Sequence, residues 1–477
     1  MRQTPLDSTR PDFGSYPELA WVAHPTSQND SKDYQRIRLT NPNSLFIDVL
    51  TNVKSGEAMA KRHHSRTDNL QSVFMRLEEL VLANSGQDEF QEIFKLTIAK
   101  LYDEKFSKEP LFRTDGDIQQ TFERIKTLLR KAEVKWPGVL LPLPTINLAP
   151  EHLDICINEL QRHTIGDNSL QALDEFFEFI VSKSMKGNKG QYFTPRHLIE
   201  MCVRMVNPQA DEIVADPACG SGGFLMHALH HMKRDGHTVG DLKSNLWGFD
   251  MDERATSIAR SLLIISGINS PNVFRLNSLS VESRHDLFIN PENLLTIEKA
   301  THSKTRNNGI FDVILTNPPF AGEIQERSIL QKYDLSQNRN RVERDILFIE
   351  RCIHLLKPGG RMAIVLPHNK LSSAVFTYVR QWMLKRCHIA AVVGIGRNMF
   401  MPHTQQKTGI VFLQKKRSED ERSLPIFFAM SEKEGKDSRG NHVRIASDLG
   451  DAPLWKRLDH DLEPIATGFQ ELHAWGR

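Results

Sequence analysis

Short β-rich runs alternate with helical segments between residues 212 and 414, and this alternation limits the fold more than any other feature of the chain. Such a strand–helix–strand pattern predicts βαβ units in a mostly parallel sheet with helices on both faces. Ligands bind such sheets beyond the carboxyl ends of the strands. The expected strands are 212–217, 245–250, 272–276, 310–316, 361–367, 389–396 and 408–414, and the expected helices are 222–233, 253–265, 343–356 and 371–385.

The apolar residues before this region recur with a different period. Apolar residues recur there at helical spacing, which predicts a helical core with helices at 70–84, 89–104, 118–133 and 153–163, and a further helix at 169–183. The first residues are polar and aperiodic. We therefore expect four parts, listed in chain order: a polar, irregular extension (1–44), an N-terminal helical domain (45–165), an α/β domain (166–420) and a C-terminal tail segment (421–477).

Composition excludes several classes of protein. With 39% hydrophobic and 25% charged residues, the chain has the profile of a soluble globular protein. It contains no apolar run near the ~18 residues of a membrane span and no secretory signal, so we expect no membrane partner. The five cysteines lack CxxC spacing, which argues against zinc and disulfides and favours a reducing, cytoplasmic location. The histidines lack partners at metal spacing, and we expect no metal site.

Two loops that follow expected strands carry chemistry. DPACGSGGF (216–224) has glycines that let a ligand approach the backbone, although its GxGG spacing differs from the dinucleotide pattern and an ordinary strand-to-helix turn remains an alternative. In GFDMDE (248–253), Asp250 is placed to accept hydrogen bonds from ribose hydroxyls. The same acidic residues would also suit a helix N-terminus. Together the two loops indicate a cofactor that contains a nucleoside.

A third loop, LTNPPF (315–320), ends the strand at 310–316 with two prolines, which cannot continue it. The prolines fix the backbone, so the Asn317 side chain and the Pro318 carbonyl can present two acceptors in one geometry. Two acceptors suit a planar amino group, whose nitrogen becomes a better nucleophile when both N–H groups are held. Phe320 offers a flat face for a base. A purely structural Asn-Pro-Pro turn is the alternative for this tetrapeptide alone.

These three loops, in this order and with GQYFTPR (190–196) upstream, resemble the S-adenosylmethionine-dependent DNA adenine-N6 methyltransferases, and more narrowly the methylase (M) subunit of type I restriction-modification systems. The resemblance covers roughly residues 165–415, and HLLKPGGRMAIVLPHNKL (354–371) and VVGIGRNMFMPHTQQKTGIVFL (392–413) resemble later blocks of that family. It implies an α/β, Rossmann-like methyltransferase sheet with an N-terminal α-helical domain, S-adenosyl-L-methionine as cofactor, and site-specific, adenine-specific DNA methylation.

The resemblance also implies roles for the matching positions. It implies a catalytic set that binds the flipped adenine: Asn317, Pro318, Pro319 and Phe320. It implies a cofactor-binding set: Tyr192, Phe193, Thr194, Asp216, Ala218, Gly220, Ser221, Gly222, Asp250 and Asn277. Asn277 departs from the family, because many relatives have an acidic residue there, and we expect an altered cofactor contact at this position.

Partners follow from the same resemblance. No base-reading motif is visible after the last expected strand, so double-stranded DNA would be recognised with a separate specificity (S) subunit. A restriction (R) subunit and a second methylase copy are further candidate partners. Two other functions stay open on the residues: methyl transfer to another planar amino group, in a protein glutamine or an RNA base, and a non-catalytic scaffold of a DNA-defence complex. No visible motif indicates which DNA sequence is recognised or what residues 1–44 do.

Overall fold

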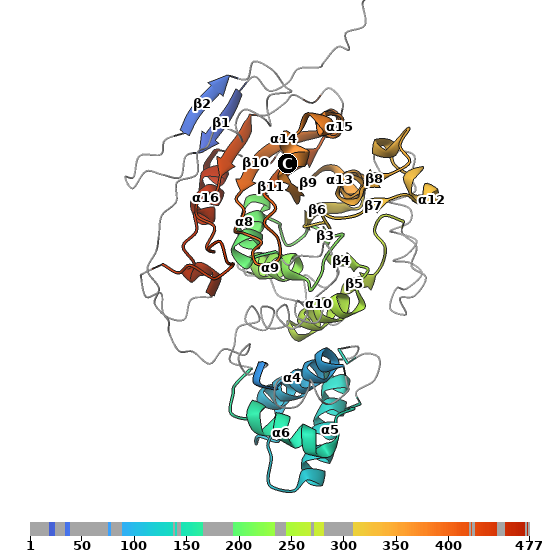
Figure 1. The fold of residues 1–477 in the computed structure, drawn as a ribbon, viewed down its shortest axis with the longest axis vertical. Helices are drawn as coiled ribbons and strands as arrows, with labels where there is room; N and C mark the ends of the chain where they lie inside the picture. Colours follow the sequence, from blue (N-terminus) through green and yellow to red (C-terminus); the bar gives the residue numbers. More distant parts are fainter. Residues whose placement is uncertain are drawn as a thin grey trace, which may run out of the picture.

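The computed structural model places a central sheet, helices packed on it and a group of N-terminal helices (Figure 1). None of the helices in the described residues is both long and apolar enough to cross a bilayer. The structure describes residues 19–23, 34–38, 75–77, 88–136, 139–140, 145–165, 194–233, 245–268, 271–280, 309–418, 421, 425–445, 454–472 and 475.

The central sheet of the described chain has ten strands in the order β2-β1-β12-β10-β11-β9-β6-β3-β4-β5 and is mostly parallel. Only β11 and β2 run antiparallel to their neighbours. The expected α/β class with a mostly parallel sheet is thus confirmed. The strands are β1 (Leu19–Ala23), β2 (Tyr34–Arg38), β3 (Val214–Asp216), β4 (Leu246–Asp250), β5 (Asn272–Arg275), β6 (Phe311–Thr316), β9 (Leu356–Pro367), β10 (Cys387–Ile395), β11 (Thr408–Lys415) and β12 (Ile426–Met430).

Helices cover both faces of this sheet, so its central strands are buried on both sides (Figure 1). In β9, Ala363 and Val365 join one hydrophobic cluster, while Met362 and Ile364 join the cluster on the opposite face. For this reason the strand sequences are continuous apolar runs, and apolar and polar residues do not alternate along them. The first cluster includes α8 (Arg196–Val206), α9 (Gly223–Lys233), α10 (Glu253–Ile265) and α16 (Leu462–Leu472), and the second includes α13 (Arg344–Leu355), α14 (His368–Ser372) and α15 (Thr377–Arg386).

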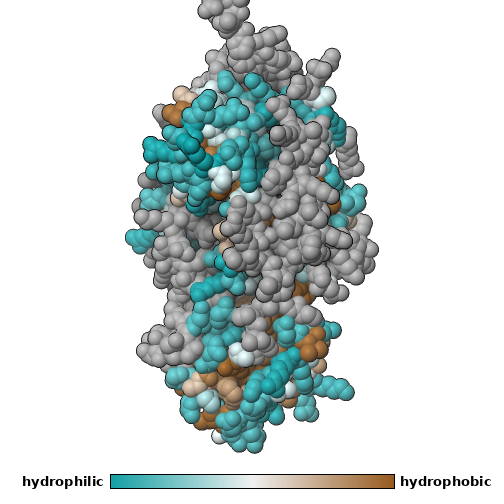
Figure 2. Space-filling view, turned by 90° about the vertical axis from the view of Figure 1, so that its right-hand side faces the viewer, coloured by the Kyte–Doolittle hydropathy of each residue, from teal (hydrophilic) through white to brown (hydrophobic). Residues whose placement is uncertain are grey.

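The N-terminal helices α4 (Glu89–Phe106), α5 (Ile118–Lys135) and α6 (Pro150–Leu160) pack beneath α10 (Figure 1). The side chains of Asp88 and Asp117 accept hydrogen bonds from the first turns of α4 and α5, as N-caps do. An ion pair between Arg254 and Asp88 joins α10 to this group. The space-filling view shows hydrophobic surface at this end of the molecule, where Val134 is 82% exposed (Figure 2).

The structure departs from the sequence expectations at both ends of the chain. The extension 1–44, expected to be irregular, contributes β1 and β2 to the sheet, and the expected tail 421–477 contributes β12 and α16. Five-residue apolar runs such as IFFAM are too short to be distinctive, and they become strands here by pairing with distant partners, since β12 lies between β10 and β1. The sheet therefore continues beyond residue 420.

Other differences concern helix ends. The helix expected at 371–385 is divided into α14 and α15 by a 3₁₀ turn, Ala374–Phe376, whose N-cap Ser373 accepts from Val375 N. Of the helix expected at 70–84, residues 75–77 are described and helical. The helix expected at 169–183 lies outside the described residues. The remaining expected strands and helices between 89 and 414 are present, with ends shifted by a few residues.

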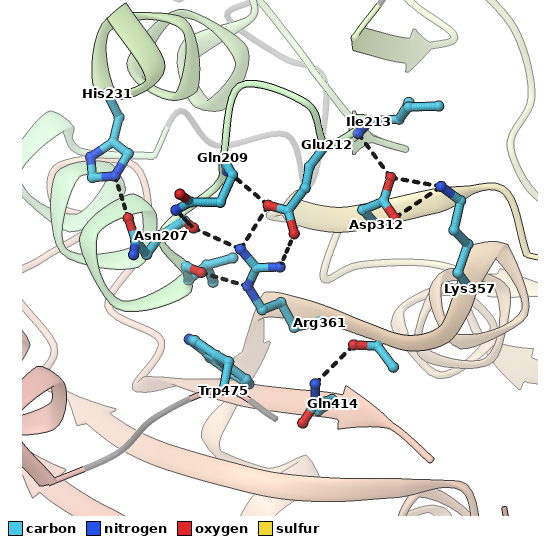
Figure 3. Close-up of polar contacts among 12 residues, drawn as sticks. Asn207, Gln209, Glu212, Ile213, His231, Asp312, Lys357, Arg361, Gln414 and Trp475 are labelled. Atoms are coloured by element: carbon cyan, nitrogen blue, oxygen red, sulfur yellow. Dashed lines mark hydrogen bonds and ion pairs between the residues drawn. The ribbon is translucent and has the colours of Figure 1, made fainter. Parts of the chain in front are cut away.

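A buried arginine ties the amino-terminal edge of the sheet together (Figure 3). Arg361, at the start of the apolar part of β9, forms a two-pronged ion pair with Glu212, with N–O distances of 2.5 and 2.8 Å. Its other N–H groups donate to the carbonyl oxygens of Val206 and Asn207, at the end of α8. The guanidinium thus satisfies carbonyl groups that a helix end leaves without intrahelical partners.

We expect Arg361→Met to lower the free energy of unfolding by roughly 3 kcal/mol, because it leaves the Glu212 carboxylate without its partner. Urea unfolding followed by circular dichroism measures the change. Adding Glu212→Gln to Arg361→Met should recover part of the loss. Arg417→Met is the matched control, since this half-exposed arginine pairs at the surface with Glu421 and should cost less than about 1 kcal/mol. Equal losses in the two single variants would contradict the assignment.

Candidate functional site

A cavity of about 400 Å³ opens at the carboxyl edge of strands β3, β4, β5 and β6. Parallel neighbours end at the same edge, so the loops that follow them meet there. The volume lies within the range of small-molecule sites, ~300–1,000 Å³. The cavity is lined by Pro217, Ala218, Gly220, Asp250, Met251, Ala255, Leu276, Asn277, Ser278, Leu279, Asn317, Pro318, Pro319, Phe320, Ile324, Glu326, Ile329, Arg344 and Phe348.

The loop after β3 has a backbone that only glycine suits. Gly222 has φ +89°, and a Cβ added there would lie 2.9 Å from the Cβ of Ala259 on α10. The loop is also tied internally, because Ala218 N donates to Asp216 Oδ1 at 3.0 Å and Gly222 N donates to the Cys219 carbonyl at 2.8 Å. This tight turn brings the backbone of Ala218 and Gly220 to the cavity wall.

Asp250 joins the loops after β3 and β4. Its Oδ2 accepts from Gly220 N at 2.9 Å, and its Oδ1 accepts from Asp252 N at 2.9 Å. The loop after β5 is tied to the same place by Ser278, whose hydroxyl donates to the Pro217 carbonyl at 2.6 Å. Asn277 lies on the cavity wall, and its Oδ1 accepts from Leu279 N at 3.0 Å. Three neighbouring loops therefore form one connected wall.

The Asn-Pro-Pro-Phe loop after β6 also lines the cavity. Asn317 Nδ2 donates to Thr194 Oγ1 at 3.0 Å, which connects this loop to the segment just before α8. Phe320 is 8% exposed and packs edge-to-face on Phe400, with ring centroids 6.1 Å apart. The prolines and this packing fix the loop beside the glycine turn.

A buried carboxyl, Asp216, and a partly buried one, Asp250, give the site its electrostatic character. Burial raises the pKa of Asp216 to about 7, with the neighbouring Asp250 adding to the rise and hydrogen bonds from Thr316 and Ala218 opposing it. Burial likewise raises the pKa of Asp250, against the backbone N–H groups of Asp252 and Gly220. The surroundings of both carboxyls disfavour their ionised forms. A bound cation would stabilise these ionised forms.

The structure brings most of the sequence-predicted residues together at the cavity. The other described ones do not line it. Those that line the cavity are Ala218, Gly220, Asp250, Asn277, Asn317, Pro318, Pro319 and Phe320. Asp216, Ser221 and Gly222 shape the turn but are not among the lining residues, and Thr194 contacts Asn317. Tyr192 and Phe193 lie outside the described residues.

Several lining residues were not found from the sequence. Ile329, from the short helix α12 (Arg327–Leu330), and Phe348, from α13, supply an apolar wall. Ile324 and Arg344 come from a small hairpin, β7 (Glu323–Ile324) with β8 (Val342–Glu343), and from the helix that follows it. The spacing of Arg344 and Phe348, four residues apart on α13, was the one available signal that both face the same side. Among the described residues, no cluster of three or more His, Cys, Asp or Glu side chains is arranged to hold a metal ion.

Comparison with known proteins gives consistent matches. A family model described as N-6 DNA Methylase matches residues 168–448. The type I restriction enzyme EcoEI methylase subunit of Escherichia coli is 29% identical over 262 residues, which cover 54% of this chain and 47% of that protein. The chain thus spans about half the length of the curated relatives it matches.

Two solved structures share the fold. A modification subunit ascribed to a type I restriction enzyme of Vibrio vulnificus YJ016 matches with a TM-score of 0.56 and 18% identity, covering 87% of this chain and 92% of that one. The type I restriction-modification system methyltransferase subunit of Streptococcus thermophilus matches with a TM-score of 0.52 and 14% identity, covering 85% and 93%. At these identities the likeness concerns the fold alone.

The raised pKa of Asp216 predicts a pH dependence of stability. A carboxyl whose pKa rises on folding binds more protons in the folded than in the unfolded chain between pH 4 and 7, so the free energy of unfolding falls as the pH rises through this window. Asp216→Asn should reduce this fall by on the order of 2 kcal/mol. Urea unfolding at pH 5 and pH 8 measures it.

The pH 5 measurement is the internal control for this variant. At pH 5 Asp216 is protonated in the folded chain but already ionised in the unfolded chain. The variant, whose asparagine retains the acceptor for Ala218 N, should therefore be more stable than the wild type at pH 5, but by less than at pH 8. Asp250 contributes a fall of the same sign and should remain in the variant. An unchanged difference between pH 5 and pH 8 would show that Asp216 is not the titrating group.

Proposed function

The chain belongs to the N-6 DNA methylase family, and on this premise we propose that it is a DNA adenine-N6 methyltransferase that uses S-adenosyl-L-methionine. We propose further that it acts as the methylase subunit of a type I restriction-modification system, as the printed names of its relatives describe them. The observation that carries the proposal is the shared cavity: the Asn-Pro-Pro-Phe loop and the glycine turn with Asp250 both line it.

The cavity suits the cofactor chemically. S-adenosyl-L-methionine, when bound, supplies an electrophilic methyl group on a positively charged sulfur. Asp250 can accept hydrogen bonds from ribose hydroxyls while its own oxygens hold the loops. Apolar side chains, among them Leu279, Ile329 and Phe348, provide surfaces for an adenine ring. The two carboxyls favour a cationic ligand, because positive charge nearby stabilises their ionised forms.

Asn317 and Pro318 would position the target. The hydrogen bond to Thr194 uses Nδ2 of Asn317, which assigns the amide oxygen the accepting role. Two N–H groups of a flipped adenine can then donate to Asn317 Oδ1 and to the Pro318 carbonyl. Held in this way, the amino nitrogen would present its lone pair to the methyl group that the cofactor supplies. The new C–N bond would form as the C–S bond breaks to leave a neutral thioether, and the surplus proton of the nitrogen would pass to water. Phe320 would stack on the flipped base.

The partners are part of the proposal. We infer that double-stranded DNA is recognised together with a specificity subunit, and that a restriction subunit and a second methylase copy complete the assembly. Action on DNA of the cell would place the protein in the cytoplasm. The helices α4–α6 would form the N-terminal helical domain, and the sheet with its covering helices the catalytic domain, which extends beyond residue 420 to include β12 and α16.

Methyl transfer from radiolabelled cofactor tests the function directly. The chain, purified with its specificity partner, is offered DNA, RNA and glutamine-containing peptides side by side. Incorporation into DNA alone, at adenine, supports the proposal. Incorporation into RNA or peptide instead would assign the acceptor to a different class, and cofactor binding without any transfer would favour the scaffold.

We predict that Asn317→Ala lowers kcat for DNA methylation by at least about 100-fold, since it removes one of two acceptors that hold the reacting nitrogen. The dissociation constant for the cofactor, measured by calorimetry, should change less than about threefold. Asn369→Ala is a matched control, as it removes the amide of an asparagine on α14, outside the cavity lining. Loss of transfer and of cofactor binding by the same factor would indicate misfolding rather than a role in the reaction.

A further inference from the structure

One wall of the cavity carries a cation that the proposed chemistry does not use. Arg344, the first residue of α13, lines the cavity beside the Asn-Pro-Pro-Phe loop. Its backbone N–H donates to the Gly322 carbonyl at 3.0 Å, and a Cβ added at Gly322 would lie 3.0 Å from one of its guanidinium nitrogens. The guanidinium therefore lies close against the chain just five residues after Asn317.

The residues on either side of Arg344 are held by a single buried lysine. Lys370 Nζ, from α14, is ion-paired with the carboxylate of Glu343 and lies 3.4 Å from Asp345 Oδ2. Its side chain is 2% exposed, so this connection is shielded from water. The connection fixes the backbone on both sides of Arg344 and links β8 and the start of α13 to α14.

Arg344 differs from the other arginines of the same segment. Arg339 stacks on Tyr378, with its guanidinium carbon 4.1 Å from the ring centroid, and Arg341 lies 3.7 Å from Glu323. Within the part of the chain that the structure describes, no side chain forms a hydrogen bond or ion pair with the Arg344 guanidinium. That holds even though Asp250 and Glu326 line the same cavity.

We propose that Arg344 binds a backbone phosphate of the DNA strand that carries the target adenine, an inference that rests on the function proposed above. A guanidinium presents a fork of N–H donors that matches two phosphate oxygens, and a phosphate contact fixes the register of a nucleotide without reading its base. Among the described residues that line the cavity, Arg344 is the one lysine or arginine, so it can hold the flipped nucleotide by its phosphate while Asn317 holds the base.

The location favours the nucleic acid over the cofactor. The polar groups suited to the cofactor follow β3, β4 and β5, whereas Arg344 follows the hairpin that comes after β6. The positively charged sulfur of the cofactor would be repelled by a guanidinium, whereas its carboxylate could pair with one, so the cofactor's dissociation constant is measured alongside the binding of DNA. A polyanion gains both from the charge and from the N–H donors. The residue is partly buried and lines the cavity, which leaves it accessible from there.

The test compares Arg344→Gln and Arg344→Lys with wild type in the complex with the specificity subunit. The substrate is unmethylated bacterial DNA, and KM for DNA, kcat and the salt dependence of kcat/KM are measured. Arg344→Gln should raise KM for DNA about tenfold with little change in kcat, as loss of uniform binding does. The slope of log kcat/KM against log salt should become shallower by about 0.9, which corresponds to one phosphate contact. Arg344→Lys should retain the wild-type slope, since it keeps the charge.

Two controls make the result specific. Arg417→Gln removes an arginine at the opposite edge of the sheet and should leave KM and slope unchanged. The calorimetric dissociation constant for the cofactor should be the same in Arg344→Gln as in wild type. An unchanged slope in Arg344→Gln, or weaker cofactor binding by the same factor as the rise in KM, would overturn the inference. If the wild-type complex does not methylate DNA, both the proposed function and this inference are wrong. If the wild type is active and Arg344→Gln has the same KM for DNA and the same salt slope, only the inference is wrong.

Discussion

The hydrogen bond from Gly220 N to the carboxylate of Asp250 is the interaction on which the site depends. Strands β3 and β4 are parallel neighbours, so their loops leave the sheet side by side, and one carboxylate holds both. A loop on its own would sample many conformations, at a cost of about 1–2 kcal/mol for each residue that must be fixed. Holding Asp250 between two backbone N–H groups fixes the loops before any ligand arrives, and the cavity is thereby preorganised.

This arrangement has a cost that is visible in the acid–base properties of the site. Asp216 is buried, Asp250 nearby is partly buried, and both have raised pKa values, so ionising them disfavours the folded chain. Sites that contain carboxyls with raised pKa values are commonly functional. A ligand of opposite charge lowers the free energy needed to ionise them. A cationic cofactor would therefore bind more tightly to this pair than its hydrogen bonds alone suggest, and would stabilise the fold in return.

Local signals predicted much of the fold and only part of the site. The apolar runs of β6, β9 and β10 are long enough to be identified as strands. The loops after β3, β4 and β6 contain combinations of residues that are uncommon outside binding sites, so they too can be identified from the sequence. The strands β1 and β12 are short and acquire their identity from each other across some 400 residues of sequence. Phe348 and Arg344 enter the cavity only because the β7–β8 hairpin turns α13 toward it, which no local pattern encodes.

The two edges of the sheet show how to distinguish a structural arginine from a functional one. At the amino-terminal edge, Arg361 is surrounded by the Glu212 carboxylate and two helix-end carbonyls, so its donors are used within the protein and its removal should cost stability (Figure 3). At the carboxyl edge, Arg344 is fixed by its neighbours, and no side chain among the described residues takes the donors of its guanidinium. A protein gains no stability from positioning a charge in this way. The gain must come from binding, and at this edge of this fold the matching anion is the phosphate of the nucleotide whose base Asn317 would hold.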